Sequence, residues 1–414
     1  MTADGDRMRP APSSVRGGTA IALAIGTANV ATYVFTVVAA RMFGPGPYGA
    51  FAALMNVLLV VGVLSLALQA TAARRIAREP ERVHEVEEAI LTVGRRSAFG
   101  LGLLLLIAAP LVDSALRLDS LVAAAVLAAA VVPITMMGAQ AGILQGERRW
   151  FPLALVYLSS GVPRLLLGGA LVWFRPDELT AILAVALGAL VPVVVGAVAL
   201  REPRERSPRT GPGDHTARAL WWETVYNSQA LLAFLVLSNV DIVIARNTLE
   251  ARDAGLYAGG LIMVKAVLFL PQFVVVLAFP SMGTDEARRS ATVASVAFVA
   301  AVGAVVTAVT SMLSGLALNF VGGDKYAGIQ DELWLFAVVG TLLSMVQLLV
   351  YSVVARQARN SIAVIWLGLV ALVVAGLSAS SVRDLVTRVV TVDAVLFATL
   401  LAISLWRLRR SASA

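Results

Sequence analysis

Two basic residues lie deep inside long apolar stretches of the sequence. Arg164 is near the middle of VYLSSGVPRLLLGGALVW, and Lys265 lies within GGLIMVKAVLFLPQF. A cation at the centre of a membrane-spanning helix costs about 2.5 to 3.5 kcal/mol even on lenient insertion scales, so both residues are candidates for function. The planar guanidinium of Arg164 suits a diphosphate, because it can donate paired charge-assisted hydrogen bonds to phosphate oxygens. One cation from each half of the chain would form a positive chamber for an anionic headgroup.

Structural roles remain open for these charged residues. Arg164 could instead pair with backbone carbonyls beside Pro163 or with an acid on a neighbouring helix, and Lys265 could reach the outer interface of the membrane. Asp241, in SNVDIVIAR, is the acid of interest. It could bind a coupling proton or sodium ion, pair with one of the two cations, or cap the end of its helix beside Arg246.

Uncharged polar residues on the same apolar stretches would complete a cavity that contacts sugar hydroxyls. The residues that we expect to line it are Asn29, Tyr33, Gln69, Asn227 and Gln272. Asn29 and Tyr33 are four residues apart and therefore share a helix face. The alternative role for each is a hydrogen bond between helices, worth about 0.6 kcal/mol on average.

The composition defines the elements that must position these residues. Of 414 residues, 59% are hydrophobic and 14% are charged, with a mean hydropathy of +0.83. Soluble domains carry about 25% charged residues, so a soluble enzyme is excluded. Continuous apolar runs predict an all-α polytopic membrane protein with about twelve spans. We place the spans at residues 17–40, 50–73, 98–116, 120–143, 152–174, 180–200, 220–244, 255–280, 290–318, 332–355, 361–380 and 390–406.

The charged residues indicate the orientation of these spans. Most of the 33 basic residues fall in alternate loops on the side that holds both ends of the chain. The positive-inside rule therefore predicts a multi-pass protein of the bacterial cytoplasmic membrane with cytoplasmic N- and C-termini. The net charge of +7 reflects this topology, so we expect no nucleic-acid partner. The basic segment from Arg74 to Arg96 is expected to lie on the cytoplasmic surface and contact anionic membrane lipids.

Metal, cofactor and nucleotide chemistry find little support in the sequence. The chain has no cysteine, and its two histidines lie in charged loops. No phosphate-binding loop of the Gly-x-x-x-x-Gly-Lys-Ser/Thr type is present, so direct use of ATP is not expected. We therefore expect no catalytic residue, no bound metal and no cofactor.

The chain divides near its midpoint into two similar halves. We expect a cytoplasmic tail (residues 1–16), an N-terminal six-helix bundle (17–200), a basic cytoplasmic linker (201–219), a C-terminal six-helix bundle (220–406) and a second tail (407–414). The hairpins AARMFGPGPYGAFAAL, from Ala39 to Leu54, and IARNTLEARDAGLYAGGL, from Ile244 to Leu261, share an Ala-Arg pair, a glycine-containing turn and a tyrosine. This similarity predicts bundles related by a parallel pseudo-repeat.

Several segments resemble one family of membrane proteins. The stretches from Ala39 to Ala77 and from Ser238 to Met282, with GERRW and VGGDKYAG, are similar to Wzx-like polysaccharide flippases of the multidrug/oligosaccharidyl-lipid/polysaccharide exporter (MOP) superfamily. The resemblance implies two six-helix bundles that open alternately to each side and move an undecaprenyl-diphosphate-linked oligosaccharide across the membrane. It also implies glycosyltransferases and a polysaccharide polymerase as partners. A cation-coupled drug or metabolite antiporter of the same superfamily and a non-transporting scaffold for glycan assembly are the alternatives.

Overall fold

The computed structural model describes residues 12–78, 82–118, 120–201, 217–268, 285–355 and 359–411. Within these ranges the chain is helical and contains no β-strand. The first half comprises α1 (Pro12–Phe43), α2 (Pro45–Val61), α3 (Val63–Arg78), α4 (Val83–Ile107), α5 (Ala109–Leu116), α6 (Leu121–Gly146), α7 (Trp150–Phe174) and α8 (Glu178–Leu200).

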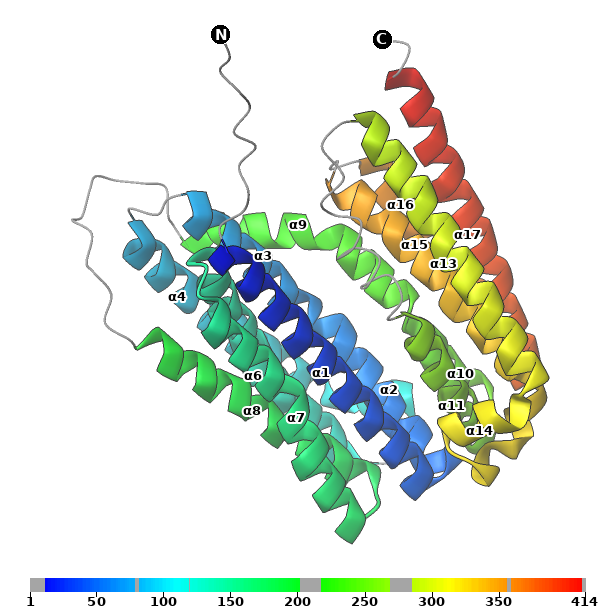
Figure 1. The fold of residues 1–414 in the computed structure, drawn as a ribbon. Helices are drawn as coiled ribbons and strands as arrows, with labels where there is room; N and C mark the ends of the chain where they lie inside the picture. Colours follow the sequence, from blue (N-terminus) through cyan, green and yellow to red (C-terminus); the bar gives the residue numbers. More distant parts are fainter. Residues whose placement is uncertain are drawn as a thin grey trace.

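The second half repeats this pattern of long helices interrupted by short ones. It comprises α9 (Ala217–Leu237), α10 (Val240–Thr248), α11 (Ala251–Leu268), α13 (Asp285–Met312), α14 (Ser314–Val321), the 3-10 helix η3 (Asp324–Glu332), α15 (Leu333–Ala355), α16 (Arg359–Gly376) and α17 (Val382–Ser411). Figure 1 shows the long helices running side by side in two groups, as expected for a polytopic α-helical membrane protein.

Ten helices in the described residues are long and apolar enough to cross a membrane, and each overlaps one of the twelve predicted spans. Of the other two predicted spans, 255–280 is described only as far as Leu268, and 361–380 corresponds to the shorter apolar helix Ile362–Gly376. The boundaries differ most at 98–116, because the observed apolar helix there is Val83–Ile107, and they also differ at 220–244, where the apolar part is Ser228–Thr248. The segment from Arg74 to Arg96 is not a separate surface helix, since α3 continues to Arg78 and α4 begins at Val83.

The helices form two bundles, and α9 crosses between them. The helices α1 and α3 to α8 pack mainly on one another, whereas α10, α11, α13, α15, α16 and α17 form the other group (Figure 1). The helix α2 of the first half packs most extensively on α11 of the second. The start of α9 lies against α3 and α4 of the first bundle, and α9 also contacts α15 and α16 of the second. Leu220 is buried in a cluster with first-half residues, and Glu223 forms an ion pair with Arg75 at 2.9 Å. The first turns of α9 thus tie the two bundles together.

The two ends of the molecule have different connections. We call the end at which α1 begins and α17 ends the terminal end, and the opposite end, where α1 turns into α2 and α10 turns into α11, the hairpin end (Figure 1). At the hairpin end, a side chain at Gly255 of α11 would lie 1.9 Å from the carbonyl oxygen of Pro45. Only a glycine permits this approach, so the two halves are in direct backbone contact there.

Close packing within the first bundle depends on glycines spaced four residues apart on α6. Gly138, Gly142 and Gly146 face α3, where a Cβ atom at Gly138 would lie 2.2 Å from the backbone oxygen of Ser65. The Ser65 hydroxyl donates to the carbonyl of Ile134 at 2.7 Å. Small residues at this spacing let two helices approach closely in a membrane, where van der Waals packing drives association.

Replacing Gly138 with alanine is expected to destabilise the protein by about 1 to 3 kcal/mol, because the added methyl group meets backbone that cannot move aside easily. The matched control is Gly100→Ala on α4, where an added Cβ meets nothing within 4 Å. Thermal unfolding of the purified variants would check this expectation. Equal midpoints for the two variants would contradict the packing of α6 on α3.

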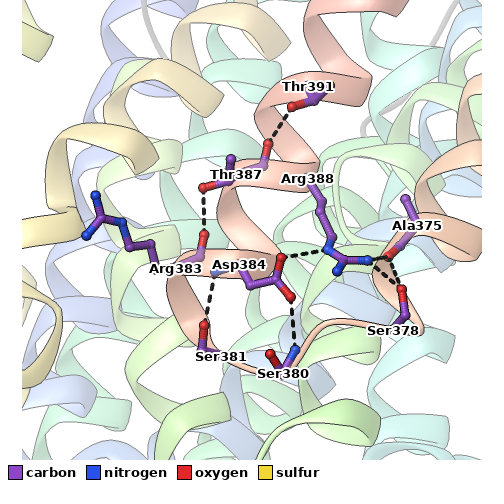
Figure 2. A network of polar contacts seen from close by, with 9 residues as sticks. All are labelled: Ala375, Ser378, Ser380, Ser381, Arg383, Asp384, Thr387, Arg388 and Thr391. Carbon is purple, nitrogen blue, oxygen red and sulfur yellow. Dashed lines mark hydrogen bonds and ion pairs between the residues drawn. The ribbon is translucent and has the colours of Figure 1, made fainter.

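The turn between α16 and α17 holds a polar network that lies wholly within the second bundle (Figure 2). Arg388 donates to Asp384 and to the carbonyl of Ala375, at 2.7 and 2.6 Å, and also to the Ser378 hydroxyl. Asp384 in turn accepts from the backbone N–H of Ser380 at 3.1 Å. These bonds cap the ends of two neighbouring helices, and they satisfy both charged groups locally.

Candidate functional site

Arg164 lies on α7 inside the first bundle. This helix packs closely on α1 and α8, because Gly161 meets the backbone of Ala28 and Gly188 meets the backbone of Arg164. The Arg164 side chain is partly buried, and its Nε atom has no hydrogen-bond partner among the described residues. A guanidinium nitrogen without a partner in a protein interior is costly, so Arg164 has unused capacity to bind an anion.

A chain of polar side chains lies on the same side of α7. Tyr157 precedes Arg164 by seven residues, which places both on one helix face. Gln69 of α3 donates to the Tyr157 hydroxyl and also to Gln145 of α6, at 2.9 Å for the latter. Gln69 therefore joins three helices of the first bundle. Hydrogen bonding between helices is the alternative role given above for these polar residues. Asn29 and Tyr33 lie on α1 and are partly buried.

Lys265 has a partner in the other half of the molecule. Its ammonium group donates to the Asn56 side-chain oxygen of α2 at 2.6 Å. Asn56 is buried, and its amide nitrogen has no partner among the described residues. Lys265 therefore links the two bundles in the apolar interior, and its expected role in an anion-binding chamber stays a prediction. The structure places Arg164 and Lys265 in different bundles and gives them different surroundings.

Asp241 lies beside a break in the seventh span. Helix α9 ends at Leu237 and α10 begins at Val240, so Asp241 occupies the first turn of α10. A carboxylate is favoured at this position by the partial positive charge of a helix N-terminus. Asp241 is buried, accepts from the Tyr257 hydroxyl of α11 at 2.8 Å, and interacts electrostatically with Lys265.

A second buried acid, Asp393 of α17, interacts with Asp241, and it was not among the predicted site residues. Its side chain is 1% exposed, neither carboxylate oxygen has a hydrogen-bond partner among the described residues, and it interacts electrostatically with Asp241. The span predicted at 390–406 places Asp393 close to a membrane surface. The observed helix begins at Val382, which puts the aspartate inside the span.

Two predicted site residues lie outside what the structure describes. Gln272 falls in the segment 269–284, and the Asn227 side chain is not described although its backbone belongs to α9. The described residues contain no group of three or more acidic or histidine side chains placed to hold a metal ion. The polar interior thus has two parts: a cationic one around Arg164 in the first bundle, and an acidic one around Asp241 and Asp393 in the second.

Several solved structures share this fold. A multidrug resistance MATE family transporter of the MOP superfamily in its inward-facing conformation gives a TM-score of 0.70 at 14% identity, over 92% of this chain and 94% of that chain. An outward-facing MATE family transporter gives 0.65 at 14% identity, over 96% of each chain. A MOP superfamily transporter from Pyrococcus furiosus, described as having a binding pocket of reverse polarity, gives 0.64 at 14% identity over 96% of each chain.

The chain therefore has the two-bundle fold of the MOP superfamily transporters. Residues 14–284, more than half of the chain, match the family described as polysaccharide biosynthesis protein. The chain belongs to this polysaccharide biosynthesis protein family, and the resemblance seen in the sequence is confirmed. Curated protein sequences give no match.

Proposed function

We propose that the protein flips an undecaprenyl-diphosphate-linked oligosaccharide across the bacterial cytoplasmic membrane by alternating access. The observation that supports this most is Arg164, an arginine inside a membrane-spanning bundle whose Nε has no hydrogen-bond partner among the described residues. A diphosphate is an anion that a planar guanidinium binds well. Membership of the polysaccharide biosynthesis protein family agrees with a substrate that joins a phosphate to sugars.

The proposed orientation puts the terminal end in the cytoplasm. The excess of basic residues in the loops on that side supports it. Glycosyltransferases would then supply the lipid-linked substrate from the cytoplasmic side, and a polysaccharide polymerase would consume it on the other side.

A cation gradient is the proposed driving force. Asp241 and Asp393 are buried, interact electrostatically, and leave two carboxylate oxygens without hydrogen bonds. A carboxyl group in such surroundings either keeps its charge and binds a cation or takes up a proton and becomes neutral. The absence of a third acidic or histidine ligand among the described residues favours the proton. The same acids suit a proton-coupled antiporter of drugs or metabolites, which is the second candidate function.

The deciding experiment uses the full chain in proteoliposomes that contain a fluorescent undecaprenyl-diphosphate-linked oligosaccharide. Flipping is measured as the fraction of headgroups that becomes accessible to a membrane-impermeant quencher. We expect the protein to raise the flipping rate at least tenfold over empty liposomes, and we expect excess unlabelled diphosphate-linked oligosaccharide to slow the labelled substrate.

The outcome for the two candidates differs. Transport of a hydrophobic cationic drug in exchange for protons, with no flipping of the lipid-linked substrate, would contradict the flippase and favour the antiporter. Inhibition by an undecaprenyl lipid without diphosphate would show that the lipid tail alone is recognised, which would contradict the role proposed for Arg164.

A further inference from the structure

Two arginines occupy equivalent positions in the two halves of the chain. Arg41 lies in the last turn of α1 in the sequence Ala-Arg, and Arg246 lies in the last turn of α10 in the same dipeptide. Each arginine therefore closes the first membrane-crossing segment of its half. Both lie at the hairpin end, and each reaches across to the opposite bundle.

Arg246 bonds to the end of α5 in the first bundle. Its Nε donates to the carbonyl of Leu116 at 2.7 Å, and its terminal nitrogen donates to the carbonyl of Arg117. The contact is reciprocal, because Arg117 donates to the carbonyl of Asn247 at 2.9 Å, and the Asn247 amide donates to the carbonyl of Ala115 at 2.6 Å. We call this set the first latch.

Arg41 makes the equivalent contact with the end of α14 in the second bundle. It donates to the carbonyl of Asn319 at 2.6 Å. In return, Lys325 donates to the carbonyl of Arg41 at 2.9 Å and to that of Met42 at 3.3 Å, and the Tyr326 hydroxyl donates to the carbonyl of Ala40 at 3.2 Å. We call this set the second latch. In both latches a cation from each bundle bonds to the helix end of the other.

The acceptors explain why cations hold these positions. The last carbonyls of a helix have no partner within the helix and carry its partial negative charge. In the closed arrangement these carbonyls accept hydrogen bonds from cationic side chains of the opposite bundle. When the bundles separate at this end, every one of these bonds must be given up together, and water must replace them.

We propose that the two latches act as a matched pair that holds the hairpin end closed and sets the resting preference of the protein for this conformation. The pairing of α1 with α14 and of α10 with α5 follows the repeat, so the halves are held at two related points. The two latches are unequal: Arg246 is 6% exposed, whereas Arg41 is exposed. Loss of Arg246 therefore has the larger effect on the equilibrium.

The test measures the separation of the bundles directly. The natural chain has no cysteine, so a pair of spin labels can be attached at Phe174→Cys and Met312→Cys. Phe174 ends α7 and Met312 ends α13, so the two positions lie at the hairpin end with one in each bundle, and both side chains are highly exposed. Double electron–electron resonance in lipid nanodiscs gives the populations of short and long distances.

We expect the labelled parent to show mainly the short distance. Arg246→Ala is expected to raise the ratio of long to short distances about tenfold, since a hydrogen bond to a charged group is lost. Arg41→Ala gives a smaller rise, and the double variant gives a larger one. The lysine variants Arg41→Lys and Arg246→Lys keep the charge and are expected to fall between the parent and the alanine variants.

Arg388→Ala supplies the matched control. Arg388 is also a cation at the hairpin end that bonds to a helix-end carbonyl, but its partners lie in its own bundle (Figure 2). Its loss is expected to leave the distance distribution unchanged.

Unchanged distances in Arg246→Ala and in the double variant, or an equal shift in Arg388→Ala, would overturn the proposal. If Arg246→Ala does not fold, Arg41→Ala still tests the proposal, because Arg41 is exposed. An unchanged ratio of long to short distances in Arg41→Ala would show that the two latches do not act as a pair. The readout involves no substrate, so it fails or succeeds independently of the flippase function.

Discussion

Replacing Arg164 with methionine is expected to slow flipping of a diphosphate-linked oligosaccharide about a hundredfold. Two charge-assisted hydrogen bonds to phosphate would be lost, and bonds to charged groups contribute about 1.5 to 3 kcal/mol each. Arg164→Lys keeps the charge but not the planar fork, so we expect a rate between those of the parent and the methionine variant. The measurement is the quencher-accessibility assay in proteoliposomes at matched protein content.

The same substitution is expected to leave the stability of the protein unchanged or to raise it. The Arg164 Nε has no partner among the described residues, and a charge inside a membrane-spanning segment is unfavourable. An arginine that served only packing would show the opposite pattern, with loss of stability and of transport together. The thermal unfolding midpoint of Arg164→Met therefore separates a substrate-binding role from a structural one.

Arg175 provides the control for this prediction. It follows α7 directly, its side chain is 77% exposed, and it pairs with Asp177 at 2.7 Å. Arg175→Ala removes a cation from the same stretch of chain without touching the bundle interior, so we expect normal flipping. Normal flipping by Arg164→Met, or equal losses in both variants, would remove Arg164 from the proposed site.

The arrangement of helices could be predicted from the sequence because the bilayer imposes it. Runs of about 20 apolar residues can only be membrane-spanning helices, since the backbone must satisfy its own hydrogen bonds there. Breaks within a span are different. Ser238 and Asn239 are polar residues within an apolar run, but polarity alone does not predict that α9 ends and α10 begins there. The crossing of α9 onto α3 depends on tertiary contacts such as Arg75 with Glu223.

The candidate site was only partly predictable for a related reason. The charge of Arg164 and of Lys265 in an apolar run is visible in the sequence, but their partners are not. Lys265 bonds to Asn56, which lies 209 residues earlier in the chain, and no local spacing indicates that pair. Asp393 was missed because its span was placed eight residues too late at the start, although an aspartate in VVTVDAVLFATL is itself a signal.

The two bundles divide the charges in a way that suggests separate tasks. The first holds Arg164 for the proposed anionic headgroup, and the second holds Asp241 and Asp393 for the proposed proton. Lys265, which interacts electrostatically with Asp241 and bonds to Asn56 of the first bundle, is placed where a change in the charge of the acids alters a contact between the bundles. Coupling requires such a difference between two states of the protein.

Replacing Asp393 with asparagine is expected to abolish the acceleration of flipping by an imposed proton gradient, while flipping without a gradient continues. Asparagine keeps the shape of the side chain but cannot take up a proton at this site. Because neither Asp393 oxygen has a hydrogen-bond partner among the described residues, the substitution breaks no existing bond. Asp241→Asn is expected to lose the acceleration as well, and in addition to weaken the bond to Tyr257.

Asp384→Asn is the matched control for the Asp393 variant, because Asp384 lies on the same helix and its hydrogen bonds among the described residues lie within the turn network of Figure 2. It is expected to keep the full response to the gradient. The measurement compares flipping rates with a proton gradient, with a sodium gradient and with neither. A full proton response in Asp393→Asn would rule out the acidic pair as the coupling site. A response of the parent protein to sodium alone would exclude the proton as the coupling ion. A bound sodium ion would then need oxygen ligands beyond the carboxylates of Asp241 and Asp393.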